Sequence, residues 1–439
     1  MNIYCTRNLL RLIQNAPQSA KVGFQYIPLN LLTALETAGC AQYGAGALSK
    51  PEHTSPLPLA AVPAPAEARP VQSEALRPAW GEKPAEDLFS WHAGLLAEDS
   101  GVTAVILIND ATRYPLVIVM KEEQDYAQLD RLFGEALTLA LQTEGVSDLG
   151  IGRYFTAAGA VCFLKACDRR QLGRLNAVNA ETQEHLQVID ARQNLQRFAS
   201  LELSRCRRYR YPAAPAALTP ARALLNQLHL LNQSPAGTAA RPLQQVTAYQ
   251  LLIALGPAQK KIAWRRVVVP AALSFRYLHN VIQTVFDWHD QHLHRFVLDT
   301  PGLPETHILM PEDPEEILGS ADSRGVKRLD DRYVALKDIV PLYGSLGYTY
   351  DLSDRWTHEI TYEKTVTLPQ MQVCLLDEKG ERPPEDVGGF AAFSVYLQIM
   401  ANPDHADHQA VKDWSDGQIE GVYTEAELKR RLEDVYFSY

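Results

Sequence analysis

The sequence predicts an α+β protein of two domains, in which the C-terminal domain is a mostly antiparallel sheet with packed helices. A chain of 439 residues is longer than one hydrophobic core usually supports. Stretches rich in proline and alanine divide it into blocks. The second block has the order strand, strand, helix, several strands and then helices, which is typical of an antiparallel sheet with helices packed on it.

The proline-rich stretches predict the domain boundaries. Proline lacks a backbone N–H and disfavours both helix interiors and sheet ladders, so such segments tend to be extended linkers. We therefore expect an N-terminal α+β domain over 1–200 with a Pro/Ala-rich insertion at 46–87. A basic, Pro/Ala-rich connector with a short helix should follow over 201–242, and the C-terminal domain should occupy 243–439.

Local patterns predict the elements of the first domain. Residues 101–121 contain two β-rich runs joined by a turn at Asn109, Asp110 and Ala111. Residues 126–145 place apolar side chains on one helical stripe that stops at Gly145. A strand over 160–166 and a helix after Cys167 complete this domain.

The second domain should begin with two strands, over 248–255 and 263–270. A helix over 274–286 follows, because apolar residues recur there at helical spacing: Leu278, Val281, Ile282, Val285 and Phe286. Further strands are expected in the segments 292–298, 347–352, 356–366 and 371–377, before a helical tail.

Net charge and cysteine content limit the classes of function that fit this sequence. The formal net charge of −10 and the pI near 5.7 disfavour a general nucleic-acid binder. The six cysteines are scattered without a CxxC pair, which favours a reducing compartment over a zinc ribbon or a disulfide scaffold. The N-terminus lacks the apolar core of a signal peptide, and no apolar run approaches the roughly 20 residues of a membrane helix. We expect a soluble, cytoplasmic protein with no membrane partner.

The segment "YDLSDRWTHEITYEK", residues 350–364, reads as a β-hairpin crowded with ionisable residues. Strand alternation puts Trp356 and His358 on one face, and the glutamates on the other. A buried histidine needs a hydrogen-bond partner, which Asp351 or Asp354 could supply. The structural interpretation of His358 is therefore a satisfied core residue.

A metal site is the alternative for these histidines. His292 and His294 are spaced i, i+2 in a predicted strand, which is a spacing that can ligate one metal ion with His358 or Asp354 as the third ligand. This makes His292, His294 and His358 the candidate ligands of a divalent metal, although a protein with no cofactor is the leading expectation.

The segment "ERPPEDVGG" predicts a rigid turn before a helix. Glu385 and Asp386 could act as general acid and base, or they could cap the helix that follows and interact with its positive end. Capping is the preferred interpretation, since acids at a helix start need no chemistry to explain them.

A basic cluster in "SRCRRYRY" consists of Arg205, Arg207, Arg208 and Arg210, interleaved with tyrosines. Guanidinium groups next to aromatic rings suit phosphates and stacked bases. An exposed helix end or an interdomain contact explains the same run without a ligand. No Walker loop, GxGxxG, GxSxG or HExxH is present in the sequence.

Three ordered motifs resemble the plasmid pRiA4b ORF-3-like family: "LHNVIQTVFDWHDQHLHRF", "YTYDLSDRWTHEITYEK" and "PPEDVGG". The matching positions are Leu278, His279, Ile282, Gln283, Trp288, His292, Leu293, His294, Phe296, Tyr350, Asp351, Asp354, Trp356, His358, Pro383, Pro384, Glu385, Asp386, Gly388 and Gly389. The resemblance covers 243–439 and implies an α+β fold of unestablished biochemical function, often associated with transposons. Ser353 stands where the family usually has glycine, and Arg382 stands where a cysteine commonly precedes the prolines, so a metal or redox role for that cysteine would not carry over.

The N-terminal half resembles a family known as a domain of unknown function. "IYCTRNLL", "SWHAGLL", "VILINDATRYPLVI" and "RRQLGRLNAVN" carry this resemblance over 1–45 and 86–200. It implies no activity.

Our leading functional hypothesis from the sequence is a mobile-element-associated binding or interaction protein without catalysis, of bacterial type, whose partner is protein or DNA. The alternatives are a metal-dependent hydrolase or nuclease that uses the His/Asp cluster, and a DNA-binding accessory factor that uses the arginine cluster. The candidate pocket comprises His292, His294, Asp351, Asp354, Trp356, His358, Glu385 and Asp386.

Overall fold

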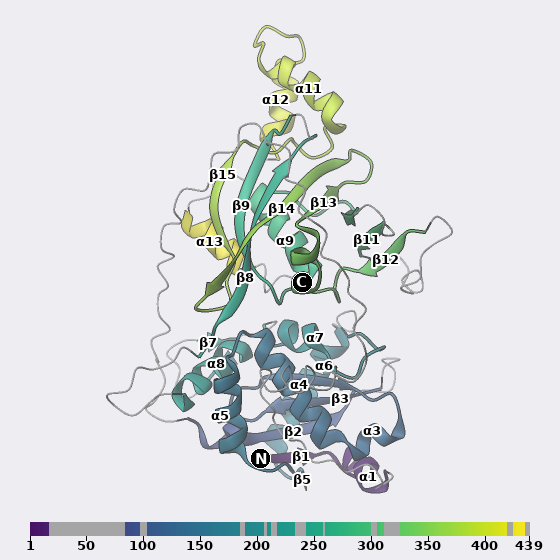
Figure 1. Ribbon diagram of the computed structural model, residues 1–439, viewed down its shortest axis with the longest axis vertical. Helices are drawn as coiled ribbons and strands as arrows, with labels where there is room; N and C mark the ends of the chain where they lie inside the picture. The colour runs from purple at the N-terminus through teal and green to yellow at the C-terminus, as the bar shows by residue number, and fades with distance from the viewer. Residues whose placement is uncertain are drawn as a thin grey trace, which may run out of the picture.

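A computed structural model of the chain contains, in the part that it describes, two large sheets packed with helices and one small two-stranded sheet (Figure 1). The structure describes residues 1–16, 84–96, 103–184, 189–205, 209–211, 217–232, 243–257, 260–299, 305–310, 325–418 and 425–434. Most of the predicted insertion at 46–87 therefore lies outside the described residues.

The N-terminal sheet is five-stranded, with the order β4-β3-β2-β1-β5. Its strands are β1 (Asn2–Cys5), β2 (Ser90–Leu95), β3 (Ala104–Asn109), β4 (Pro115–Val119) and β5 (Cys162–Lys165). Strand β1 pairs in parallel with both β2 and β5, whereas β2, β3 and β4 are antiparallel. The predicted turn after Asn109 connects β3 to β4.

Helices cover both faces of this sheet, because the alternating side chains of its central strands are apolar on both sides. Helices α1 (Arg7–Asn15), α3 (Glu123–Ala127), α4 (Leu129–Thr143), α5 (Asp148–Ala158) and α8 (Pro220–Leu231) contribute to the core on one face, as does the 3-10 turn η3 (Glu86–Phe89). Helices α6 (Arg169–Glu184) and α7 (Arg197–Leu203) contribute to the core on the other face.

The two halves of the chain contact each other through α7. Ala199 and Leu203 pack in the N-terminal domain, whereas Phe198 and Leu201 belong to the C-terminal core. A single β-bridge joins Val146 to Gln244. The short strands β6 (Tyr209–Arg210) and β7 (Ala217–Leu218) pair before the predicted connector helix α8. Because α7 belongs to both cores, the exact domain boundaries stay a prediction.

The C-terminal sheet is eight-stranded, with the order β12-β11-β10-β13-β14-β8-β9-β15. The strands are β8 (Val246–Leu255), β9 (Ala263–Pro270), β10 (His294–Leu298), β11 (Thr306–Leu309), β12 (Lys327–Asp330), β13 (Ser345–Tyr350), β14 (Trp356–Leu368) and β15 (Cys374–Lys379). Every pair is antiparallel except β11 with β12. The prediction of an α+β fold with a mostly antiparallel C-terminal sheet is confirmed.

Helix α9 (Phe275–Phe286) forms the centre of the C-terminal core. Its predicted apolar stripe is buried against the inward side chains of the sheet, among them Phe296, Tyr348 and Trp356. A left-handed Asp287 ends the helix and turns the chain toward β10.

The remaining C-terminal helices are α10 (Leu336–Tyr343), α11 (Gly389–Met400), α12 (His408–Asp416) and α13 (Glu425–Asp434). Leu432 of α13 reaches the core, and Arg431 pairs with Asp287 at 2.9 Å. Helices α11 and α12 contact each other and project from the end of the domain (Figure 1). Among the described residues, none of the helices combines the length and apolarity needed to cross a bilayer.

Candidate functional site

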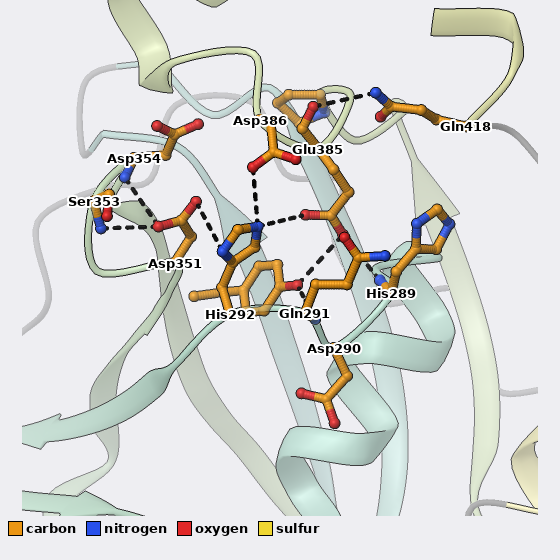
Figure 2. A network of polar contacts seen from close by, with 12 residues as sticks. His289, Asp290, Gln291, His292, Asp351, Ser353, Asp354, Glu385, Asp386 and Gln418 are labelled. Atoms are coloured by element: carbon orange, nitrogen blue, oxygen red, sulfur yellow. Dashed lines mark hydrogen bonds and ion pairs between the residues drawn. The ribbon is translucent and has the colours of Figure 1, made fainter. Parts of the chain in front are cut away.

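Three segments far apart in the sequence meet at one end of the C-terminal sheet (Figure 2). They are the loop between α9 and β10 (287–293), the turn between β13 and β14 (351–355) and the loop before α11 (382–388). The first segment carries His292, and the other two bring Asp351, Glu385 and Asp386 toward it. We call His292, Asp351, Glu385 and Asp386 the His292 group.

The His292 ring lies among three carboxylates. Its Nδ1 is 3.8 Å from Oδ2 of Asp351, and its Nε2 is 3.1 Å from Oδ1 of Asp386 and 3.9 Å from Oε2 of Glu385. His292, Asp351 and Asp386 each offer a ligand atom within 4.8 Å of the other two. Among the described residues, this is the group of histidine, cysteine and acidic side chains with such spacing.

Two of these carboxylates are buried. The side chains of Asp351 and Glu385 are only 5% and 4% exposed, whereas Asp386 is 63% and His292 27% exposed. Glu385 uses Oε1 to accept hydrogen bonds from the backbone N–H of His289 (2.9 Å) and the hydroxyl of Tyr350 (3.4 Å). Its other oxygen, Oε2, is buried without a hydrogen-bond partner and faces His292. Such an oxygen is costly to bury unless a proton or cation reaches it.

Tyr350 contacts the buried carboxylate of Glu385. Its hydroxyl accepts a hydrogen bond from the N–H of Gln291 at 3.0 Å and lies next to Glu385. Burial raises the pKa of Tyr350, and the Glu385 carboxylate raises it further, so the hydroxyl stays protonated and available to donate. The sequence did not single out Tyr350 or His289 as site residues, because their contacts with Glu385 join segments 35 and 96 residues apart.

The turn holding Asp351 is tight. Asp351 and Arg355 have positive φ angles of 54° and 58°, a conformation that aspartate tolerates better than most residues. Oδ1 of Asp351 accepts hydrogen bonds from the N–H groups of Ser353 and Asp354. That leaves Oδ2 directed toward His292. The strand pattern suggested Asp351 as a hydrogen-bond partner of His358. In the structure Asp351 faces His292 instead.

The loop "PPEDVGG" is arranged differently from the capping prediction. The described cap of α11 is Gly388, and its N–H donates to Oδ2 of Asp354 at 2.9 Å. Asp354 thus supplies the carboxylate at the helix start, while Glu385 and Asp386 face His292 instead. The prediction that Glu385 and Asp386 cap α11 is wrong, because the positive φ of Asp386 (56°) turns the chain away before the helix begins.

The two glycines meet the prediction of positive φ, with values of 91° at Gly388 and 74° at Gly389. A Cβ on Gly389 would lie 2.7 Å from the carbonyl oxygen of Asp354, so this position has no room for a side chain. The close approach locks the 382–388 loop against the β13–β14 turn.

Arg382, which stands where the resembled family has cysteine, has a structural role. Its guanidinium lies 5.1 Å from the Trp288 ring centre and donates to the carbonyls of Asp287, Pro383 and Gln418. It therefore joins the acidic loop to the end of α9.

His294 does not join His292 as a ligand. It begins β10 with its side chain buried in the core, where it stacks on His279 with ring centres 3.5 Å apart. Its Nε2 bonds to Asp331 at 2.9 Å, and Asp331 also pairs with Arg276. His292 precedes the strand, so the i, i+2 alternation that placed both histidines on one face does not apply.

His358 is also a core residue. It is 3% exposed, and its Nδ1 donates to the carbonyl of Trp356 at 3.0 Å. Burial lowers the pKa of His358 to about 3, so it is neutral at physiological pH. Trp356 beside it is fully buried and packs on Phe390 of α11. The prediction that His292, His294 and His358 share one metal is therefore not met by the geometry.

The arginine cluster is only partly described. Arg207 and Arg208 lie outside the described residues. Arg205 is buried and forms a bidentate ion pair with Glu144, with N–O distances of 2.7 and 2.5 Å. Its guanidinium is thus occupied inside the protein and is not available to a nucleic acid. Arg210 is exposed on β6.

Comparison with known proteins finds one family match in each half of the chain. The plasmid pRiA4b ORF-3-like protein family matches residues 247–430, and a domain of unknown function (DUF6933) matches residues 66–214. The uncharacterized protein y4hQ of Sinorhizobium fredii (strain NBRC 101917 / NGR234) is 32% identical over 156 residues, covering 35% of this chain and 73% of that protein. A crystal structure of the protein of unknown function MM3350 from Methanosarcina mazei Go1 is 24% identical, covering 41% of this chain and 96% of that one, with a TM-score of 0.34.

None of these proteins has a described catalytic function. The His292 group and the three motifs around it fall within the matched residues 247–430. By this match and by its identity to the Sinorhizobium protein, the chain belongs to the plasmid pRiA4b ORF-3-like protein family.

Proposed function

We propose that the C-terminal domain binds a divalent metal ion at His292, Asp351 and Asp386, with Glu385 beside them, and that the protein is a metal-dependent hydrolase. The observation that carries the proposal is the unpartnered, buried Oε2 of Glu385, which faces a histidine already flanked by two further carboxylates.

The charge balance of the site supports a cation. Three carboxylates surround a single imidazole, and two of them are almost completely buried. Like charges repel one another, and the repulsion is offset when a positive charge lies between them. A divalent ion would supply that charge, and mixed imidazole and carboxylate ligands suit zinc, manganese or iron.

The chain's own residues would then have separate tasks. A divalent metal ion lowers the pKa of a bound water and polarises an ester or phosphoryl oxygen. His292, Asp351 and Asp386 would hold the ion, and the exposed Asp386 leaves the group open to solvent on one side. Glu385, held by His289 and Tyr350, is placed to accept a proton within this group.

The first experiment is the metal content of natively purified, untagged protein, measured by inductively coupled plasma mass spectrometry. We expect near-stoichiometric zinc, manganese or iron, with metal lost in His292→Ala and in Asp351→Asn. His405→Ala is the matched control, since His405 is an exposed histidine 3.8 Å from Asp407 and lies outside the group. Metal content unchanged in His292→Ala would refute the site.

Hydrolysis is tested separately, with an activated phosphodiester and an activated carboxylic ester as probes. We expect turnover that needs the metal and falls at least about 100-fold in Glu385→Gln, since general acid–base groups contribute roughly that much. If the protein binds metal but shows no turnover, the metal site is supported and the hydrolase activity is refuted.

A non-catalytic interaction role is the second candidate, and helix α11 favours it. Val395 and Leu397 are about half exposed, and Trp414 of α12, which is 41% exposed, contacts Tyr396 of α11. Exposed apolar surface of this kind is often buried against another protein molecule. Under this proposal a second copy of the chain covers α11, and sedimentation velocity should show self-association that Val395→Asp with Leu397→Asp abolishes.

Location and biological context belong to the proposal as well. A cytoplasmic location is supported by Cys5, Cys162 and Cys167, which are thiols outside any disulfide. The family's name supports an association with mobile elements. Cell fractionation of the native host tests the first, and the second predicts that the gene lies beside transposition or plasmid functions.

A further inference from the structure

The outer face of the C-terminal sheet carries a basic hollow that the His292 group does not use. It encloses about 380 Å³ and is lined by Arg295, Thr349, Leu352, Arg355 and Thr357. A volume of this size falls in the range of small-ligand sites.

Strand register explains how the hollow is built. Arg295 on β10 lies opposite Thr349 on β13, and Thr349 lies opposite Thr357 on β14. The three side chains therefore form one row across three strands, on the face that points away from α9. Leu352 and Arg355 reach the same hollow from the β13–β14 turn.

The two arginines have no carboxylate partner among the described residues. Nε of Arg295 is a buried atom without a hydrogen-bond partner, although arginine nitrogens are normally satisfied when they are buried. Glu359, the next acidic residue along β14, is already paired with Lys261 at 3.0 Å. Two uncompensated positive charges in one hollow contrast with the net charge of −10 of the whole chain.

The donor set selects the ligand class. Two guanidinium groups offer fork-shaped pairs of N–H donors, and two threonine hydroxyls add O–H donors between them. Tetrahedral oxyanions with several acceptor oxygens match this arrangement better than a single carboxylate does. We infer that this hollow binds a phosphate dianion, either free or as the terminal group of a small phosphomonoester.

Binding is measured by isothermal titration calorimetry on metal-stripped protein, with inorganic phosphate and glucose 6-phosphate as probes. We expect saturable binding that weakens at least tenfold in Arg295→Gln and in Arg355→Gln. Because Arg355 is exposed, the second variant keeps the test informative if the first fails to fold. Arg131→Gln, on α4 of the other domain, is the control for the loss of one positive charge.

The outcomes separate the sources of the phosphate. Equal affinity for both probes supports free phosphate, and tighter binding of the sugar phosphate supports a phosphomonoester. Binding that is absent, or unaffected by both arginine variants, overturns the inference. So does a thymidine oligonucleotide that binds more tightly than either probe with steep salt dependence, because that result indicates a strand rather than a small ligand. His292→Ala should retain phosphate binding, so failure of the metal site and failure of this hollow are distinguishable.

Discussion

Two histidine environments lie side by side in this protein and differ in every property that matters for chemistry. His294 and His279 form a buried stack whose ring nitrogens bond to Asp331, Asp290 and Tyr348. His292, two residues before His294, is partly exposed and faces carboxylates at distances of 3.1 to 3.9 Å. No ring nitrogen of the first environment is a buried atom without a hydrogen-bond partner, although Oδ1 of the neighbouring Asp331 is one. In the second environment both Nε2 of His292 and Oε2 of Glu385 are buried without such a partner.

The difference teaches that the exposure of the ring and the partners of its nitrogens separate the His279–His294 stack from His292. In the stack, burial lowers the pKa of His279 to about 3, helped by the neighbouring His294. Burial raises the pKa of Asp331, but the hydrogen bond from His294 and the charge of Arg276 outweigh it, so its pKa lies below the usual value. These groups stabilise one another inside the core.

The largest effect should come from removing Asp331. In Asp331→Ala, the buried Arg276 and His294 lose their shared partner, and breaking a buried pair in this way typically costs about 3–5 kcal/mol. Urea denaturation should show this loss in the free energy of unfolding. A cost below about 1 kcal/mol would mean that the stack does not stabilise the core.

The two neighbouring histidines should respond very differently to the same change. We expect His294→Ala to lower the free energy of unfolding by about 2–4 kcal/mol, since it leaves a cavity and an unpaired carboxylate. His292→Ala should cost less than about 1 kcal/mol, because that side chain is 27% exposed and bonds weakly. Chemical denaturation of the metal-free protein measures both costs. Equal losses in the free energy of unfolding would contradict the difference proposed between the two histidines.

The pH dependence of stability should report the buried histidines. His358 has a folded pKa of about 3, below the unfolded value near 6.5, so the unfolded state takes up the proton first as the pH falls. The free energy of unfolding should therefore decrease below pH 6.5, by up to about 1.4 kcal/mol per pH unit for each such histidine, and be flat above it.

His358→Leu removes one of these groups and should flatten the slope between pH 6.5 and pH 5, although it lowers stability overall. Equilibrium unfolding at several pH values gives the slope, and His405→Ala, which alters an exposed histidine, should leave it unchanged. A slope that is the same in His358→Leu would show that His358 is not buried as a neutral ring.

The smallest effect should have the opposite sign. Without metal, Glu385→Gln relieves repulsion among the three carboxylates, and we expect the free energy of unfolding to rise by about 0.5–1 kcal/mol. The same variant should keep most of the stabilisation that added metal gives to the wild type, because His292, Asp351 and Asp386 are the residues proposed to hold the ion. Thermal denaturation with and without manganese measures both, and a destabilised metal-free variant would indicate that Glu385 is a structural residue.

The sequence by itself determined much of the architecture. The stripe from Leu278 to Phe286 predicted α9, the alternation from Trp356 onward predicted the buried face of β14, and the glycine pair predicted positive φ at the start of α11. These features follow from periodicity and backbone sterics within a few residues, which a single sequence contains. The short strands β11 and β12 were missed, because strands of four residues have little pattern of their own.

Only the tertiary structure decided which ionisable residues form a site. His292, His294 and His358 were equivalent candidates in the sequence, yet just one of them faces the acidic loop at 382–388. The sequence predicted Asp386 at the start of α11 and Asp354 next to the histidines. The structure places Asp354 at the start of α11 and Asp386 next to His292. The physical reason is that each role depends on a hydrogen-bond partner or a carboxylate brought close by strand pairing and helix packing, from segments 30 to 100 residues away.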